Sequence, residues 1–266
     1  MCKLKSAIIM KDRIFMPDYD SHSKMLDELK INDDYFNASK VFVRAELSPK
    51  NEDAFSDIDG WEFSVDQDIT PEWFDKKDCA ERMRNTVKEW AKTHIFIGQN
   101  DLKISHGKNI FIKDCKNVDI YGKAMVKYIC GNTTVENISD NATVESICGD
   151  ATVNSICGKA TVKYIYDNAT VKYICGDATV NSICDNATVE SICGDATVKS
   201  IRGNTTVKYI YDNATVENIC DNATVISSPY KRWSNSASLI IAGNATFKDC
   251  YSKTIYQAGG WKLVEV

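Results

Sequence analysis

The chain of 266 residues holds few residues of the types that enzymes use for acid, base or nucleophilic chemistry. Its three histidines, His22, His94 and His106, lie far apart and lack the short spacing typical of a metal site. The phosphate-binding glycine-rich loop, the GxSxG motif and the HExxH motif are all absent from the sequence. The sequence therefore predicts no catalytic set, no metal site and no cofactor, and an enzyme with an unrecognised site is kept only as an alternative.

An acidic stretch from Glu46 to Glu81 is the strongest candidate for a binding surface. It holds 12 acidic residues against three lysines, a balance of −9, whereas the whole chain carries −5. Acidic groups attract a basic partner over about 8 Å at physiological salt, and aromatic anchors are typical of protein interfaces. Aromatic residues interleave with these acids, namely Phe55, Trp61, Phe63, Trp73 and Phe74. The stretch is either a contact surface for a basic protein or a solvated loop over a domain core.

Within this stretch we expect six carboxylates to steer a basic partner and two tryptophans to anchor it. The predicted partner-binding residues are Asp57, Asp59, Trp61, Glu62, Asp66, Asp68, Glu72 and Trp73. The segment from Asp57 to Gly60 also resembles the start of a calcium loop, but Trp61 stands where a further ligand is needed. We therefore expect no calcium there.

The eleven cysteines show no disulfide framework. Seven of them fall on the last position of a nine-residue repeat, namely Cys130, Cys148, Cys157, Cys175, Cys184, Cys193 and Cys220. Because a repeat position explains them, we expect reduced cysteines that behave as small hydrophobic side chains.

The sequence predicts a cytoplasmic protein. No apolar run approaches the roughly 20 residues of a membrane-spanning helix. The apolar part of the segment from Met1 to Met10 is too short for a signal peptide.

The repeat runs from Gly122 to Pro229, where a nonapeptide is written twelve times. One unit extends from Asp140 to Cys148. Gly or Asp followed by Asn or Asp is turn chemistry, and Thr-Val is strand chemistry. We expect Ala142 and Val144 to point inward and Thr143 outward, with a bend at Glu145–Ser146 that returns Ile147 to the core. A fixed short period of this kind predicts a β-solenoid.

The sixth position of the repeat indicates how many units form one turn. With two nonapeptides per turn, Glu145 stacks between Lys127 and Lys163, and no like charges meet in either ladder of sixth residues. One or three units per turn would stack like charges on one another. We therefore expect 18 residues per turn and six turns.

Three domains are expected: a small acidic α+β domain at 1–106, the solenoid at 107–228 and a C-terminal cap at 229–266. Upstream, 110–112 and 118–121 should form an irregular first turn; downstream, Pro229 and Trp233 break the period, and 261–266 should form a closing strand. Elements expected in the first domain are two strands within 7–16, a helix at 23–29, strands at 41–47 and 61–65, a helix that starts at Thr70–Pro71, and a helix at 78–92 capped by Asp78.

The Asn168-Ala169-Thr170-Val171 spacing resembles that of pentapeptide-repeat proteins, although the period here is nine. The pairing of two nonapeptides in a turn resembles the calcium β-roll without its Gly-Gly-x-Gly-x-Asp ligands. The whole chain, with 61–90 followed by the array, resembles uncharacterised nonapeptide-repeat proteins of gut bacteria and their phages. Some pentapeptide-repeat proteins mimic DNA. The resemblance to the pentapeptide-repeat family therefore implies binding to a nucleic-acid-binding enzyme, although this array is neutral.

Taken together, these patterns predict a non-enzymatic protein-binding solenoid whose acidic domain engages a basic partner. A phage-encoded inhibitor of a host nucleic-acid-binding defence protein fits this prediction. We expect no direct contact with nucleic acid or membrane. The alternative is a structural scaffold that self-assembles, including a homodimer formed through one end of the solenoid.

Overall fold

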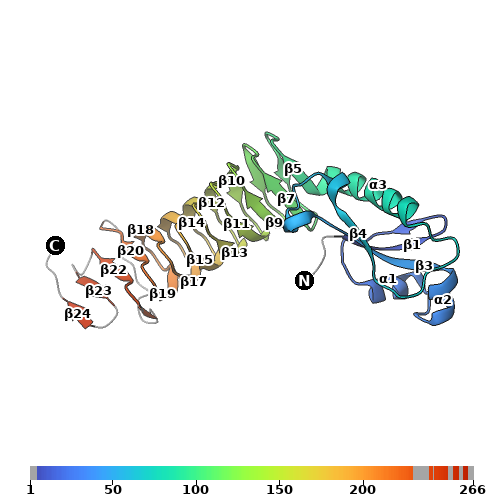
Figure 1. Ribbon diagram of the computed structural model, residues 1–266. Helices are drawn as coiled ribbons and strands as arrows, with labels where there is room; N and C mark the ends of the chain where they lie inside the picture. Colours follow the sequence, from blue (N-terminus) through green and yellow to red (C-terminus); the bar gives the residue numbers. More distant parts are fainter. Residues whose placement is uncertain (1–4, 230–239, 242, 251–253, 258–259, 263–266) are drawn as a thin grey trace. The chain divides into compact units, whose positions relative to one another are not determined.

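The computed structural model describes residues 5–229, 240–241, 243–250, 254–257 and 260–262. The chain is mainly β, and it divides into two compact units, Met1–Ile95 and Phe96–Val266 (Figure 1). The first unit is a small α+β structure, and the second is a β-solenoid. Trp233 and residues 263–266 of the expected cap lie outside the described residues.

The N-terminal unit is built on a four-stranded antiparallel sheet of order β2-β1-β3-β4. Its strands are β1 (Lys5–Met10), β2 (Ile14–Phe15), β3 (Phe42–Ser48) and β4 (Glu62–Val65). Its helices are α1 (His22–Leu29), α2 (Tyr35–Lys40) and α3 (Lys76–His94), with 3-10 turns at Lys50–Glu52 and Ile58–Gly60.

Both faces of this sheet are covered, so β1 is buried along its whole length. Successive side chains of a strand point to opposite faces. Ile9 packs with Met83 of α3 on one face, and Ile8 packs with Met25 of α1 on the other. Figure 1 shows α3 on one side of the sheet and α1 and α2 on the other. The two-layer cover holds the loops after β3 and β4 in place.

Three local expectations for this unit were wrong or incomplete. No helix starts at Thr70–Pro71, because the Pro71 carbonyl accepts the Phe74 N–H in a turn at 2.9 Å and the chain then leaves the helical path. The long helix begins at Lys76, since the Asp75 carboxylate caps it by accepting the Asp78 N–H at 2.8 Å. Helix α2 was missed.

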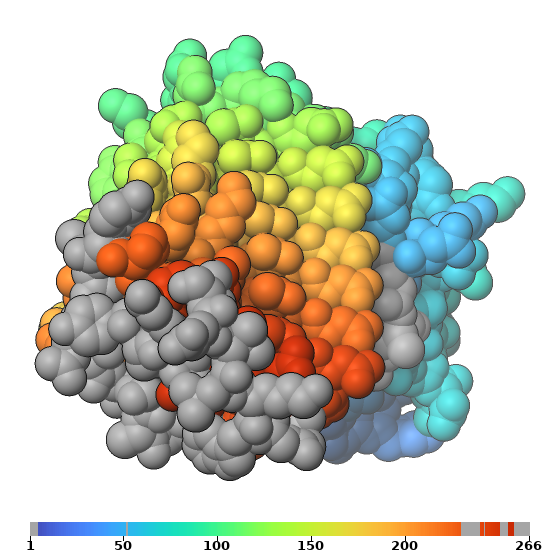
Figure 2. All heavy atoms as spheres, turned by 90° about the vertical axis from the view of Figure 1, so that its left-hand side faces the viewer, coloured from blue at the N-terminus to red at the C-terminus, as the bar shows by residue number. Residues whose placement is uncertain are grey.

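The second unit consists of two parallel sheets that alternate along the chain. One has the order β24-β23-β22-β20-β18-β16-β14-β12-β10-β8-β6, and the other has the order β21-β19-β17-β15-β13-β11-β9-β7-β5. Figure 2 shows successive turns as neighbouring rows of atoms, from green to orange. The strands before the repeat are β5 (Ile95–Ile97), β6 (Lys103–Ile104), β7 (Ile110–Lys113) and β8 (Val118–Ile120). The strands of the repeat are β9 (Met125–Cys130), β10 (Thr134–Ile138), β11 (Thr143–Ile147), β12 (Thr152–Ile156), β13 (Thr161–Ile165), β14 (Thr170–Ile174), β15 (Thr179–Ile183), β16 (Thr188–Ile192), β17 (Thr197–Ile201), β18 (Thr206–Ile210), β19 (Thr215–Ile219) and β20 (Thr224–Ser227). The last strands are β21 (Ile240–Ile241), β22 (Thr246–Asp249), β23 (Thr254–Gln257) and β24 (Gly260–Lys262).

The register of 18 residues is confirmed. Val144 of β11 pairs with Val126 of β9 and with Val162 of β13. The sixth-position ladder forms as expected, with Lys127 Nζ 2.7 Å and Lys163 Nζ 3.7 Å from the carboxylate of Glu145. The nonapeptides supply six turns, but the solenoid has about eight, because irregular strands continue the same two sheets at both ends. Two of these, β5 and β6, precede residue 107.

Each corner of the coil requires a left-handed residue at the first repeat position. Gly149 has a φ of +64°, and Asp140 and Asp167 have a φ of +56°. Glycine adopts this conformation freely, whereas aspartate needs a local hydrogen bond to offset the strain. That bond is present, since the Asp167 carboxylate accepts the Gly149 N–H of the preceding turn at 3.0 Å. Both Gly and Asp therefore occur at this position, because both can adopt the left-handed conformation.

Three residues of each unit fill the core. Ala142, Val144 and Ile147 are fully buried, as are their equivalents along the array. The expected bend at Glu145–Ser146 does not divide the strand, because β11 continues through both residues while its pairing skips Glu145. Thr133 replaces the alanine of one unit, and its buried hydroxyl donates to the Cys130 carbonyl at 2.6 Å.

The C-terminal end of one sheet changes from parallel to antiparallel pairing. Strand β22 joins β20 in parallel, and β23 and β24 then fold back as antiparallel neighbours. Parallel strands require a long crossover, but antiparallel strands can close through a short turn. The expected strand from Trp261 corresponds to β24 within the described residues.

The substitution Val171→Asp should lower the free energy of unfolding by more than about 3 kcal/mol, because it places an unpaired carboxylate in the apolar core. Val171 is fully buried, whereas neighbouring Thr170 is half-buried on the outer side of the strand. Thr170→Ser should stay within about 0.5 kcal/mol of wild type. Thermal melting of both variants measures the contrast, and equal melting temperatures would refute the inward and outward assignment.

Glu145→Gln should lower the free energy of unfolding at neutral pH by about 0.5–1 kcal/mol. The hydrogen bond from Lys127, with Lys163 beyond it, holds the pKa of Glu145 below its ordinary value. A group with a lowered folded-state pKa stabilises the fold above its unfolded pKa, about 4.3, and loses this contribution as pH falls through the folded value. In urea unfolding the difference from wild type should shrink between pH 7 and pH 3, and a constant difference would contradict the ion-pair ladder. Glu145→Lys should be costlier and more sensitive to salt.

Candidate functional site

Many acidic residues of the Glu46–Glu81 stretch stabilise local backbone. The carboxylates of Asp53, Asp57 and Asp75 accept backbone N–H groups two or three residues further on, at 3.0, 3.1 and 2.8 Å. Such contacts satisfy donors at the start of turns and helices, which would otherwise have no partner. These three carboxylates therefore have a structural role as well as a charge, and all three residues remain exposed.

The predicted site residues do not form one surface. Asp59 lies against α3, where its carboxylate is 2.6 Å from Lys88 Nζ and lines an open hollow with Lys76 and Arg84. Asp66 and Asp68 line a different hollow. Glu62 and Glu72 are exposed and line neither of these two hollows. The structure thus separates Asp59, which has basic neighbours, from Asp66 and Asp68, which have acidic ones.

Trp61 was wrongly predicted to anchor a partner. Its side chain is 1% exposed and belongs to the core under α3, and its indole N–H donates to Ser56 Oγ at 3.0 Å. Trp73 is half-buried against the same core, and its indole N–H donates to the Lys40 carbonyl at 2.8 Å. Both tryptophans of this stretch therefore belong to the core of the unit and do not indicate a partner surface.

The strongest candidate for a binding surface is an acidic face formed by two loops that lie far apart in the sequence. We define the acidic face as Asp33, Asp34, Asp66 and Asp68 with Tyr35 and Ile69, which together line one open hollow. Arg44 lies in the same hollow and pairs with Asp33. Four aspartates thus face one arginine. No ion pair within the described residues involves Asp68.

Gln67 fixes the position of one of the two loops. Its side-chain oxygen accepts the Arg44 N–H at 2.8 Å, and its amide nitrogen donates to the carbonyls of Phe42 at 3.2 Å and Ile69 at 2.6 Å. These bonds fasten the loop after β4 to β3. They hold Asp66 and Asp68 on either side of a fixed residue, so the acidic face is preorganised.

Two exposed aromatic residues stand beside this acidic hollow, and sequence reasoning missed both. Tyr35 is 72% exposed and Phe36 is 61% exposed at the start of α2. The Asp34 carboxylate caps this helix by accepting the Asn37 N–H at 2.8 Å. The available signal was an Asp-Asp pair directly before two aromatic residues. It was overlooked because the segment lies outside the densest acidic run.

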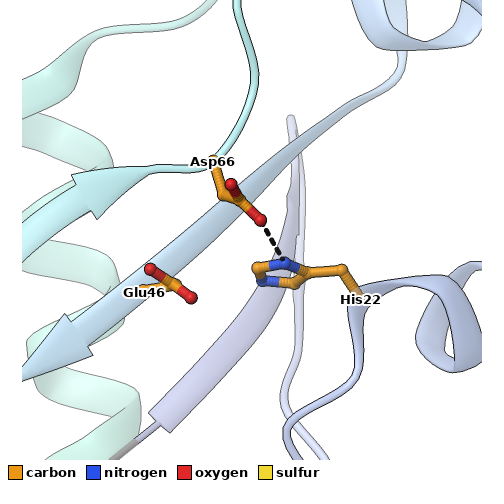
Figure 3. A group of neighbouring side chains, drawn as sticks. All are labelled: His22, Glu46 and Asp66. Atoms are coloured by element: carbon orange, nitrogen blue, oxygen red, sulfur yellow. Dashed lines mark hydrogen bonds and ion pairs between the residues drawn. The ribbon is translucent and has the colours of Figure 1, made fainter. Parts of the chain in front are cut away.

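A second polar group lies at the edge of the same face. His22, Glu46 and Asp66 each present one ligand atom, and these three atoms lie within 4.8 Å of one another (Figure 3). His22 opens α1, Glu46 lies on β3, and Asp66 follows β4. This is the one such His/Cys/Asp/Glu group among the described residues. Sequence spacing could not reveal it, because antiparallel pairing brings three distant segments together.

Stacking in the solenoid creates a row of chemically active side chains. Cys130, Cys148 and Tyr166 follow paired isoleucines, so they occupy the same corner of three successive turns. Hydrogen bonds from the Cys130 thiol and the Tyr166 hydroxyl stabilise the Cys148 thiolate and lower the pKa of Cys148 to about 7. Burial raises the pKa of Cys175, which holds the same position in the other row. The ten cysteines of the described part of the chain are free.

Comparisons with protein-family models, curated proteins and solved structures found no match. Among the described residues, no helix combines the length and the apolar character that a membrane crossing requires. The function must therefore be inferred from the sites themselves.

Cys148 should react with iodoacetamide about threefold faster than Cys175 at pH 7.5. A larger thiolate fraction outweighs the lower intrinsic nucleophilicity of a less basic thiolate. Burial alone would make Cys148 react more slowly, because Cys148 is buried while Cys175 is only half-buried. A faster reaction of Cys148 would therefore not be an effect of exposure. Peptide mass spectrometry after brief alkylation measures both rates in one sample. Tyr166→Phe and Cys130→Ala should each slow Cys148 alone, and equal rates in all variants would refute the stabilised thiolate.

Proposed function

We propose that this protein is a non-enzymatic binding protein that holds a basic protein partner on its acidic face. The observation that carries the proposal is that exposed Tyr35 lines one hollow with the four aspartates of the acidic face, and that exposed Phe36 follows it directly in the chain. Exposure of two adjacent aromatic side chains to water is unfavourable, and a partner that covers them would bury this apolar surface.

Charge and aromatic surface would act at different stages of binding. The carboxylates attract a positively charged partner and accelerate the encounter, an effect that salt screens. The tyrosine and phenylalanine then supply the buried contact area from which most of the binding energy arises. Because Gln67 already holds the loop after β4, little further ordering is needed on that side when a partner binds.

The class of partner that fits is a protein with a basic, nucleic-acid-binding surface. Such surfaces carry clustered Lys and Arg for phosphate groups, and carboxylates can occupy the same positions. The biological setting that we propose is a phage-encoded inhibitor of a host nucleic-acid-binding defence protein. The solenoid would serve as a rigid scaffold, since its formal charge is zero from residue 107 onward.

The alternative to a binding protein is a scaffold that self-assembles, and the edge of one sheet favours it. Strand β5 is the last strand of its sheet, and Ile97 at its end is 49% exposed. Unpaired strand edges can pair with a second copy. A molecular mass that rises with concentration in light scattering would favour the scaffold over the binding protein.

A photo-crosslinking amino acid placed at Tyr35 should capture basic proteins from a bacterial lysate, and 0.5 M NaCl should abolish the capture. Asp68→Lys should reduce it at least tenfold, because the substitution reverses a charge on the acidic face. Asp59→Lys is the matched control, because this substitution makes the same change of charge beside the basic residues of α3.

The same probe at Tyr173, which is 46% exposed on the solenoid, serves as the second control. Circular dichroism confirms that each variant is folded. Identical captured proteins from the Tyr35 and Tyr173 positions, or equal losses for Asp68→Lys and Asp59→Lys, would refute the acidic face as the binding site.

A further inference from the structure

His22 is held in one orientation by its surroundings. It is the first residue of α1, and its side chain is only 10% exposed. Ring atom Nε2 lies 3.2 Å from the carbonyl oxygen of Ala45, and ring atom Nδ1 lies 3.2 Å from Asp66 Oδ2. Figure 3 shows the Asp66 carboxylate above the ring, joined to it by a dashed line, and the Glu46 carboxylate to the left of the ring.

These two contacts fix the roles of the ring nitrogens. A backbone carbonyl can only accept a hydrogen bond, so Nε2 must carry the hydrogen that it donates to Ala45. In a neutral ring, Nδ1 then presents a lone pair to the carboxylate of Asp66. Two electron-rich groups at this distance repel each other unless a proton or a cation lies between them.

The geometry points to a divalent cation held by His22 Nδ1 and the carboxylates of Glu46 and Asp66. We propose that these three side chains form a metal-binding site on the N-terminal unit. Histidines that ligate metals commonly donate their second ring N–H to a backbone carbonyl, as His22 does to Ala45.

Little movement is needed to complete the site. Ligand atoms bound to one ion at about 2.0–2.2 Å lie about 3–4 Å apart, and the three atoms here lie within 4.8 Å of one another. Asp66 has the freedom to close the gap, because its side chain is 64% exposed. Water would complete the coordination, as is usual when a protein offers only three ligands.

The ligand set suits Zn²⁺ and Mn²⁺ among biological cations. Imidazole nitrogen favours zinc and its neighbours, while carboxylate oxygen also accepts manganese. Zinc is a poor probe for this chain, because the ten free cysteines of the described residues offer thiolates that compete for it. Manganese binds thiols weakly, so the cysteines do not compete for it, and the nitrogen coupling of an imidazole distinguishes the His22 group from sites made of carboxylates alone.

This inference does not rest on the proposed function, although the two share Asp66. A bound cation would neutralise Asp66 and leave Asp33, Asp34 and Asp68 of the acidic face charged. The two ideas can therefore fail separately. Asp68→Lys should abolish capture of a basic partner and leave metal binding unchanged, whereas His22→Ala should do the reverse.

The test is titration of the full chain with Mn²⁺, followed by the electron paramagnetic resonance signal of the free ion. One equivalent should bind, and pulsed measurements should show the nitrogen coupling of an imidazole ligand. His22→Ala and Asp66→Asn should each weaken the binding at least tenfold, and His22→Ala should remove the nitrogen coupling. Glu46→Gln should weaken it as well.

His94→Ala is the matched control. His94 also places one ring nitrogen near a backbone carbonyl, that of Trp90 at 2.8 Å, and the other near one carboxylate, that of Asp18 at 3.5 Å. Thermal melting in the presence of a chelator checks that each variant is folded. The absence of bound Mn²⁺ at 1 mM, or equal binding by His22→Ala and wild type, would overturn the proposal.

Discussion

The parallel pairing of residues 18 positions apart is the constraint on which the solenoid depends. Once the left-handed residue at the first repeat position sets the corner, each side chain meets its own equivalent from the turn before. The core can then be built almost wholly from Ala, Val and Ile, because each fits between copies of itself. The same rule holds outside the core, where Ser146 is covered by Tyr128 and Tyr164 of the adjacent turns.

Stacking of this kind also concentrates chemical properties. A single repeat position that favours cysteine yields rows of thiols, and a tyrosine in such a row becomes a hydrogen-bond donor to its neighbour. At the sixth position opposite charges stack, as Lys127, Glu145 and Lys163 do. Like charges also meet elsewhere in the array, since Asp167 and Asp185 stack at the first position. The formal charge from residue 107 onward is nevertheless zero, so the acidity of the chain is carried by the part that lacks the repeat.

The solenoid could be predicted from the sequence because its contacts recur at a fixed separation. Charge compatibility at the sixth position was enough to select 18 residues per turn. Val144 was placed in the core by its alternation with Ala142, and Ile147 by the bend expected at Glu145–Ser146. The irregular turn of β7 and β8 was also expected, whereas β5 and β6 were not, because they keep the spatial register without keeping the sequence period. The left-handed corner was recognisable from Gly and Asp, but the bond that lets aspartate replace glycine became visible only with the neighbouring turn present.

The candidate binding surface of the N-terminal unit could not be predicted in the same way. Composition identified an acidic stretch, yet aspartates within it cap turns and helices, and Trp61 lies in the core. The charged groups that do converge come from the loop before α2 and the loop after β4, and one glutamine fastens the second of these loops to β3. Antiparallel pairing sets these neighbours, and their separation along the chain carries no periodic signal. Where contacts are not repeated, residue type indicates what a side chain can do, and only the fold decides which partners it meets.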